Sequence, residues 1–128
     1  MPLYQCYAPP GSLDDEQRVK VAQAITDIHC ELTTAPPTFV HVQFHDRNTA
    51  GDAQPIKLSG GIRAGRPDAV TEELVSRISA AVSEIGGLAP DSITMRTTET
   101  PASWILEGGR VMPEPGQEAA WEAAGARA

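Results

Sequence analysis

Two arginines and a histidine have the side chains best suited to holding a small anion. Arg63 and Arg66 flank a glycine in the segment IRAGRP, in a loop expected between a strand and a helix. Two guanidinium groups at this spacing can bind a carboxylate through paired hydrogen bonds; the alternative is two solvated loop arginines. His29 lies four residues after Ile25 and three before Leu32, on the apolar side of a helical pattern. It is either a hydrogen-bonded structural histidine or part of a site.

Two further groups could move a proton. Pro2 follows Met1, and a methionine before so small a residue is normally removed, which would leave a free secondary amine. The reference pKa of an α-amino group is about 7.7–8.0. Nearby cations or burial would lower that pKa and give a base, whereas an acidic cluster would keep the amine protonated and give an acid. Many proteins nevertheless begin Met-Pro without using the proline. Glu107, in WILEGGR, is either a surface carboxylate at a helix end or a base in a pocket.

Other groups of reactive residue types predict no additional site. His41 and His45 share a strand face, but about 3.3 Å per residue places them roughly 13 Å apart, too far to chelate one ion. No glycine-rich segment has the spacing and the lysine of a phosphate loop. We therefore expect no metal site and no cofactor. Two cysteines make no disulfide framework, and we interpret Cys6 and Cys30 as packing residues rather than reactive thiols.

Composition limits the class of protein. The 128 residues fit one domain, residues 1–128, and the 41% hydrophobic and 21% charged residues are typical of a globular chain. A formal charge of −7 argues against a nucleic-acid binder, which needs a basic face. No apolar run approaches the roughly 20 residues of a membrane span, and the amino terminus lacks a secretory pattern. We expect a cytoplasmic protein with neither nucleic acid nor membrane as partner.

The first half of the chain has the pattern of a β-α-β unit over residues 2–46. Aromatic and aliphatic side chains in residues 2–8 predict a short strand that ends at a proline-rich turn. Ser12 is expected to cap a helix. The buried face of that helix repeats at helical period through Val21, Ile25, Ile28 and Leu32. Residues 39–46 then alternate apolar and polar side chains, as in a strand with one buried face.

The second half repeats this pattern over residues 56–98. Residues 56–62 predict a strand, although two glycines weaken it. Asp68 is expected to cap a second helix, which Gly86-Gly87 ends by supplying a left-handed conformation. Residues 92–98 alternate again and predict the last strand.

Together the two halves predict an α/β (α+β) fold of two consecutive β-α-β units. Equivalent positions such as Phe39 and Ile93 lie 54 residues apart. The expected sheet has four strands with both helices on one face, followed by a C-terminal tail over residues 99–128 that is weakly helical around Trp121. The two tryptophans of this tail suggest that it packs onto another surface, either of its own chain or of a neighbouring subunit. The uncovered sheet face carries histidine, glutamine, threonine and arginine side chains, so it needs water or a partner, and we expect an oligomer.

Four segments of the sequence occur together in a way that resembles a known family. PLYQCY, AITDIH, RAGR and ETPASWILEGGRVMPEPG follow one another over nearly the whole chain. This combination resembles the tautomerase superfamily, and within it the cis-3-chloroacrylic acid dehalogenase group. The resemblance implies two β-α-β units assembled as a homotrimer and a small carboxylate substrate.

Roles follow from the resemblance position by position. It implies that Pro2 shuttles a proton, that Arg63 and Arg66 bind the substrate carboxylate, and that His29 holds and polarises the substrate. Glu107 matches the glutamate that activates water in the dehalogenases. Because several residues match the family at once, a chance match at each of them is improbable. The purely structural interpretation of each residue is weaker for that reason.

The sequence departs from the dehalogenase pattern at Arg96. The tyrosine that assists water activation in the dehalogenases falls on this position. A guanidinium stays charged and cannot act as a phenol, so Arg96 would either pair with Glu107 or add a contact to an anionic substrate.

Three hypotheses of function result. The first is keto–enol tautomerisation of small 2-oxo or unsaturated carboxylates, of the phenylpyruvate-enol type, with neutral Pro2 as the base. The second is hydration or hydrolytic dehalogenation of cis-3-haloacrylates, which needs protonated Pro2 and a water directed by Glu107. The third is a non-catalytic trimer that binds a carboxylate through Arg63 and Arg66.

Overall fold

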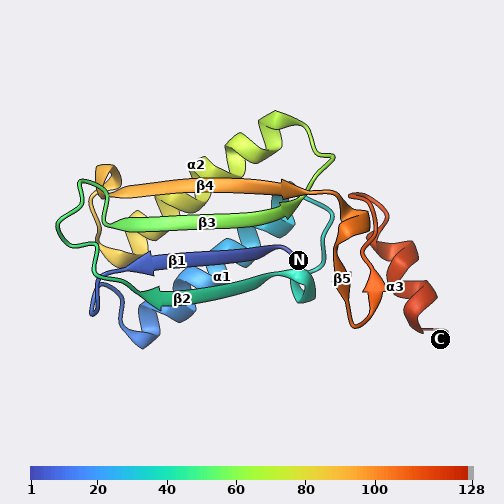
Figure 1. The fold of residues 1–128 in the computed structure, drawn as a ribbon, viewed down its shortest axis with the longest axis horizontal. Helices are drawn as coiled ribbons and strands as arrows, with labels where there is room; N and C mark the ends of the chain where they lie inside the picture. The colour runs from blue at the N-terminus through green and yellow to red at the C-terminus, as the bar shows by residue number, and fades with distance from the viewer. Residues whose placement is uncertain (127–128) are drawn as a thin grey trace.

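A four-stranded mixed sheet forms the centre of the protein (Figure 1). The computed structural model describes residues 1–126. The strands are β1 (Leu3–Ala8), β2 (His41–Asp46), β3 (Ile56–Arg63) and β4 (Ile93–Thr100), in the spatial order β2-β1-β3-β4. β1 is parallel to β2, β3 is parallel to β4, and the two pairs meet antiparallel between β1 and β3. Each β-α-β unit therefore supplies one parallel pair.

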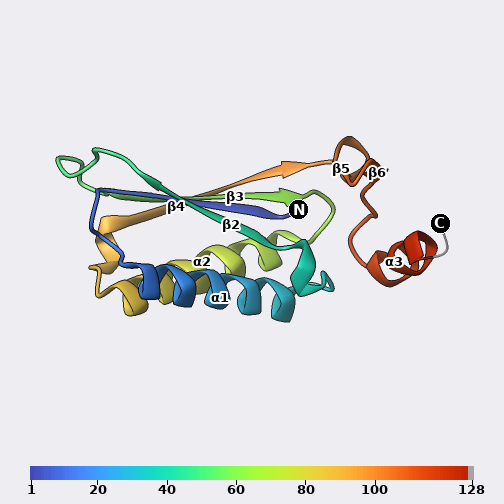
Figure 2. The same ribbon diagram turned by 90° about the horizontal axis from the view of Figure 1, so that it is seen from below.

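Two long helices cover one face of this sheet (Figure 2). They are α1 (Asp15–Leu32) and α2 (Asp68–Gly86). Their buried residues recur at helical spacing, with Val21, Ile25 and Ile28 on α1 and Leu74, Ile78 and Val82 on α2. These side chains pack against the inward-facing residues of β1 and β3 and make the main core. No helix in the described part of the chain is long and apolar enough to cross a membrane.

The expected fold class is confirmed, and the differences lie at element boundaries. Ser12 does not cap α1; its hydroxyl donates to the carbonyl of Pro9 at 2.6 Å. Asp14 caps the helix instead, in a reciprocal pair with Gln17 that satisfies two backbone N–H groups. Asp68 is the first residue of α2 rather than its cap.

The end of α2 agrees with the sequence, whereas the starts of two strands do not. Gly87 ends the helix with a φ of 60°, a left-handed conformation that favours glycine. Short 3₁₀ turns, η1 (Pro37–Phe39) and η2 (Pro90–Ser92), precede β2 and β4 and delay both strands. Each turn begins with a proline, which cannot donate a hydrogen bond to a strand ladder.

The C-terminal tail is more structured than its composition indicates. After the 3₁₀ turn η3 (Ala102–Trp104), it forms a hairpin of β5 (Leu106–Glu107) and β6 (Arg110–Val111), and then α3 (Glu118–Ala126). The hairpin turn is Gly108-Gly109, at φ of 58° and 77°. Positive φ at both central positions matches the twist of a two-residue hairpin. Hairpin and α3 lie beside the sheet, at the end where the chain begins (Figures 1 and 2).

The tail packs onto its own chain through one of its two tryptophans. The ring of Trp121 meets Phe39 edge-on with centroids 5.5 Å apart, and its indole N–H donates to the carbonyl of Val111 at 2.7 Å. The guanidinium of Arg110 lies over the same ring. Trp104, by contrast, is 76% exposed. The tail therefore packs onto its own chain through Trp121, whereas Trp104 is left exposed by its own chain.

The face of the sheet opposite the helices is polar, as the alternation predicts. Gln5 accepts hydrogen bonds from Tyr7 on its own strand and pairs with His45 on β2. A hollow of about 400 Å³ opens on this face, and its lining includes Lys57 and Arg96. The covered face and the open face thus differ in chemistry as well as in packing.

Candidate functional site

The amino terminus meets the ends of α1 and β3 at one end of the sheet (Figure 1). Pro2 is buried, and its carbonyl accepts a hydrogen bond from the N–H of His41 at 3.0 Å. The side chain of Met1 packs against a second apolar cluster that contains Phe39 and Met112. This cluster joins the amino terminus to the C-terminal tail.

The amine at this end of the chain has neighbours that act on its charge in opposite directions. Burial, and next the charge of Arg63, lower the pKa of the Met1 amine to about 6. Glu107 forms an ion pair with the same amine. Glu107 belongs to β5, so its interpretation as a helix-end carboxylate is wrong, and the hairpin carries it to the amino terminus.

His29 lies at the end of α1 with no exposed surface. Its Nδ1 shares a hydrogen bond of 2.7 Å with the hydroxyl of Tyr4. Its Nε2 is buried and has no hydrogen-bond partner among the described residues. Burial, and then the charges of Arg66 and Arg63, lower the pKa of His29 to about 3. The ring is therefore neutral at physiological pH and has one nitrogen left for a ligand.

Tyr4 is a neighbour of His29 that the sequence analysis did not single out. It lies on β1 among the inward-facing residues and is only 2% exposed. Alternation in the first strand predicts that inward position, but no local signal connects it with a histidine 25 residues later.

Both terminal nitrogens of Arg63 donate hydrogen bonds to groups of the same chain. One donates to the carbonyl of Pro113 at 2.6 Å, and the other donates to Glu118 at 2.9 Å. The side chain is 1% exposed and lies near the ring of Phe39. The interpretation as a solvated loop arginine is therefore wrong for Arg63.

Arg66 is the arginine with an unused donor. Its Nη1 donates to the carbonyl of Arg63 at 3.4 Å, while its Nη2 is buried without a hydrogen-bond partner among the described residues. Burial, and next the charge of Arg63, lower its pKa from the usual value. The charge of Arg66 also lowers the pKa of His29, so the two residues with an unpaired nitrogen are near enough to interact electrostatically.

Glu118, the partner of Arg63, is a second residue that sequence reasoning missed. It begins α3 and is only 3% exposed. Thr34 donates to it at 2.7 Å, and the backbone N–H of Gly116 donates as well. Burial alone would raise its pKa, but the hydrogen bonds from Thr34 and Arg63 outweigh burial and lower it to about 2. The carboxylate is ionised at neutral pH.

Arg96 is the one predicted site residue that this chain does not bring to the amino terminus. It lies opposite Ser59 in the sheet, four residues before Arg63 along β3, which is roughly 13 Å at strand spacing. It lines the hollow on the open face instead. Glu107 has the Met1 amine as its ion-pair partner, so the expected pairing of Arg96 with Glu107 is not formed within one chain.

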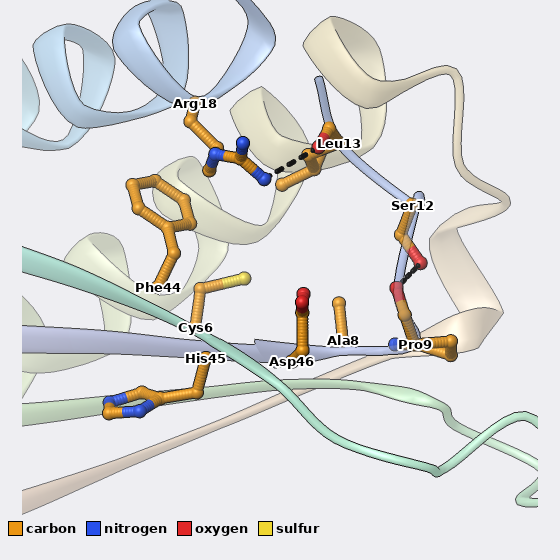
Figure 3. Close-up of a pocket in the computed structure, with 9 residues that line it drawn as sticks. All are labelled: Cys6, Ala8, Pro9, Ser12, Leu13, Arg18, Phe44, His45 and Asp46. Carbon is orange, nitrogen blue, oxygen red and sulfur yellow. Dashed lines mark hydrogen bonds between the residues drawn. The ribbon is translucent and has the colours of Figure 1, made fainter. Parts of the chain in front are cut away.

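A small pocket at the opposite end of β1 carries no comparable chemistry (Figure 3). It has a volume of about 10 Å³, at the lower limit for a single water molecule. Arg18 there donates to the carbonyl of Leu13. Cys6 is buried, and burial raises the pKa of its thiol to about 11, as expected of a packing residue. Among residues 1–126 no three His, Cys, Asp or Glu side chains gather as metal ligands do.

Comparison with known proteins gives consistent matches. Residues 1–53 match a family model described as "Putative oxalocrotonate tautomerase enzyme". The crystal structure of N1, a member of the cis-3-chloroacrylic acid dehalogenase (cis-CaaD) family, is 28% identical over 94% of this chain and 90% of that chain, with a TM-score of 0.87. Native Ps01740 is 35% identical over 82% of this chain and 99% of that chain, with a TM-score of 0.76.

More distant structures share the fold. A fused 4-OT wild type asymmetric trimer is 18% identical over 85% of this chain and 94% of that chain, with a TM-score of 0.73. No curated protein matches the sequence.

Proposed function

The chain belongs to the tautomerase superfamily, and from this membership we propose that it is a cofactor-free acid/base enzyme acting on small 2-oxo or unsaturated carboxylates. The proposed reaction is keto–enol tautomerisation of the phenylpyruvate-enol type. Its base is the secondary amine of Pro2 after removal of Met1. Its carboxylate-binding groups are Arg66 and Arg63, and His29 orients the substrate.

One observation supports tautomerisation above the other reactions. The amine at this end of the chain has a pKa of about 6, lowered by burial and by Arg63. Pro2 is the next residue inward and is itself buried. Once Met1 is removed, burial and the charge of Arg63 would act on the Pro2 nitrogen in the same direction and favour its neutral form. A neutral amine can take a proton, which is the step that tautomerisation requires.

The unpaired nitrogens beside the amine supply the rest of the chemistry. Arg66 offers a buried N–H to a carboxylate, and a charge-assisted hydrogen bond in such a place is strong. His29 stays neutral, and in the tautomer where Tyr4 donates to Nδ1, its Nε2–H can donate to a substrate oxygen. Pro2 would take a proton from one atom of the bound substrate and return it to another. Fixed donors around the developing enolate oxygen would stabilise the charge in the transition state.

Hydration or dehalogenation of cis-3-haloacrylates is the second candidate, and the position of Glu107 favours it. This carboxylate lies against the amine, where it could direct a water molecule while protonated Pro2 donates to the neighbouring carbon. The two reactions need opposite protonation states of Pro2, so the dependence of rate on pH separates them.

We also propose that the chain assembles as a homotrimer. Similar folds include a 4-OT protein described as a trimer, and the polar face of the sheet is left uncovered by its own chain. Arg96 lies on that face, so it could reach a catalytic site only across a contact between copies. In a trimer it would add a cation to the site of a neighbouring copy.

The test uses protein without a tag, in which the measured mass confirms that Met1 is absent. Phenylpyruvate-enol ketonisation and halide release from cis-3-chloroacrylate are followed side by side across a pH series. We expect ketonisation to fall as the pH drops through the pKa of the Pro2 amine, because protonation removes the base. Pro2→Ala should lower the rate by a factor of at least about 10²–10⁴.

The control is Pro10→Ala, in the exposed turn at the far end of β1, which should leave the rate unchanged. Halide release that is lost as the pH rises would support the dehalogenase instead. Ketonisation that survives Pro2→Ala undiminished would refute the amine mechanism. Carboxylate binding without turnover of either substrate would leave a non-catalytic binding protein.

A further inference from the structure

Met1 fills the space directly in front of the nitrogen of Pro2. Its carbonyl carbon is bonded to that nitrogen, so the residue stands where a substrate must approach the proposed base. The side chain of Met1 is only 18% exposed. Removal of Met1, which the proposed function requires, therefore opens a largely enclosed place that holds one residue.

The backbone of Met1 lies near the polar groups of the candidate site. Its amine forms an ion pair with Glu107. After burial, the charge of Arg63 is the next cause that lowers the pKa of this amine. The backbone end of Met1 is therefore close to groups that are proposed to bind or activate a substrate.

The side chain of Met1 lies instead against apolar residues. Phe39 and Met112 are the large buried members of this second cluster, and Ile105 packs against the cluster as well. On β3, the methyl carbon of Met1 lies 3.3 Å from the point that a Cβ on Gly61 would occupy. A glycine at position 61 therefore leaves room for the end of the Met1 side chain.

This lining favours an apolar occupant. Phe39, Ile105 and Met112 have no hydrogen-bond donor in their side chains, so a polar group among them would lose its water without gaining a partner. The hydroxyl of Thr98 lies 3.9 Å from the same point at Gly61, but Thr98 is exposed and its hydroxyl marks the outer edge. An apolar group gains free energy here because its surface is removed from water.

We propose that the place of the Met1 side chain is a subsite for an apolar substituent of the substrate, lined by Phe39, Met112 and Gly61. An acid with a substituent about as long as a methionine side chain fills this subsite. A three-carbon acid, such as pyruvate or a 3-haloacrylate, leaves it unfilled. The inference rests on the proposed function, because it assumes that Met1 is removed and that Arg63 and Arg66 bind the carboxylate.

The test compares two ligands that share one reactive group. Pyruvate and 4-methylthio-2-oxobutanoate are titrated calorimetrically into protein whose mass confirms that Met1 is absent. Both are 2-oxo acids, but the second carries the complete side chain of methionine, so the ratio of their dissociation constants reports the substituent alone. We expect the longer acid to bind at least about tenfold more tightly, because its additional apolar atoms are buried.

A substitution at the floor of the subsite tests its position. In Met1-free Gly61→Val the nearest atom to the new Cβ is the carbonyl oxygen of Leu3 at 3.7 Å, an ordinary contact, and valine suits a strand. Its methyl groups take up the space of the substituent, so we expect the preference for the longer acid to fall at least about fivefold. Gly51→Val is the matched control, since Gly51 has open space and no positive φ, and it should keep the ratio of the wild type.

The outcomes distinguish failure of the subsite from failure of the proposed function. If the wild type binds pyruvate and the longer acid equally well, or if Gly61→Val keeps the full preference, the subsite is refuted and the carboxylate site stands. If the wild type binds neither acid, or if Arg66→Ala binds pyruvate as well as the wild type does, the carboxylate site is refuted and this inference with it.

Discussion

A neutral histidine and an unpaired arginine nitrogen define this site at the scale of single residues. His29 has a pKa of about 3 because it is buried and faces Arg66 and Arg63. A buried polar atom without a partner is costly unless a ligand or water satisfies it. Both His29 Nε2 and Arg66 Nη2 are such atoms. Two such atoms, on residues whose charges influence each other, are what a site prepared for a polar ligand would show.

The hydroxyl of Tyr4 should be needed for the stability of this arrangement. Tyr4→Phe removes the partner of His29 Nδ1 and leaves a second buried nitrogen unsatisfied, which typically costs about 1–3 kcal/mol. Chemical denaturation of wild type and variant measures the difference in the free energy of unfolding. Tyr7→Phe is the matched control, because the Tyr7 hydroxyl bonds to half-buried Gln5. Equal losses in the two variants would contradict the special role of the Tyr4 bond.

At the scale of elements, the C-terminal hairpin and α3 complete the site that the β-α-β units begin. The hairpin carries Glu107 to the amino terminus, and the first residue of α3 supplies Glu118 to Arg63. The hairpin depends on its turn, where Gly108 and Gly109 both have positive φ. Residues with a Cβ rarely adopt that conformation. The position of Glu107 therefore depends on two glycines.

Replacing one of these glycines should loosen the hairpin without filling any space. Gly109→Ala has no atom within 4 Å of the new Cβ, so its cost is the strain of positive φ, about 1 kcal/mol. Hydrogen exchange of the Met112 amide, which donates to the carbonyl of Ile105, should then accelerate about fivefold. Gly51→Ala is the control, since Gly51 also has open space but no positive φ. Unchanged exchange at Met112 in Gly109→Ala would show that the turn does not hold the hairpin.

At the scale of the whole molecule, one face of the sheet carries an unusual share of positive charge. Arg47, Lys57 and Arg96 line the same hollow, although the chain as a whole has a formal charge of −7. Lys57 pairs with Asp52, and Arg47 lies over the ring of Tyr7. The helices cover the other face (Figure 2), so an assembly of copies would bury this one.

The proposed trimer should be sensitive to extra positive charge on the open face. Ser59→Arg adds a further cation to the hollow, where like charges repel across a buried contact. Light scattering should give three times the 13.6 kDa chain mass for the wild type and a smaller mass for the variant. Ser76→Arg, on the exposed side of α2, is the matched control and should keep the mass of the wild type. A monomeric wild type would refute the trimer.

The sequence alone determined the elements and their order, because hydrophobic spacing is a local property. The helical period of Val21, Ile25 and Ile28 predicts α1, and the repeat at 54 residues predicts two similar units in one sheet. The family resemblance, together with residue type, singles out the candidate site residues Pro2, His29, Arg63, Arg66 and Glu107. Their catalytic roles stay predictions, as does the single domain of residues 1–128.

Only the tertiary structure decided which of these residues have partners and which do not. Arg63 and Glu118 are 55 residues apart, and Thr34 and Glu118 are 84 apart. No local pattern encodes such pairs, because they form only when the tail packs across the end of the sheet. The same packing leaves Arg66 with an unused nitrogen, while strand register keeps Arg96 on the open face. Residue types and their spacing thus determine which reactive groups the chain contains. Long-range packing determines which of those groups are charged or paired, and which donors stay free for a ligand.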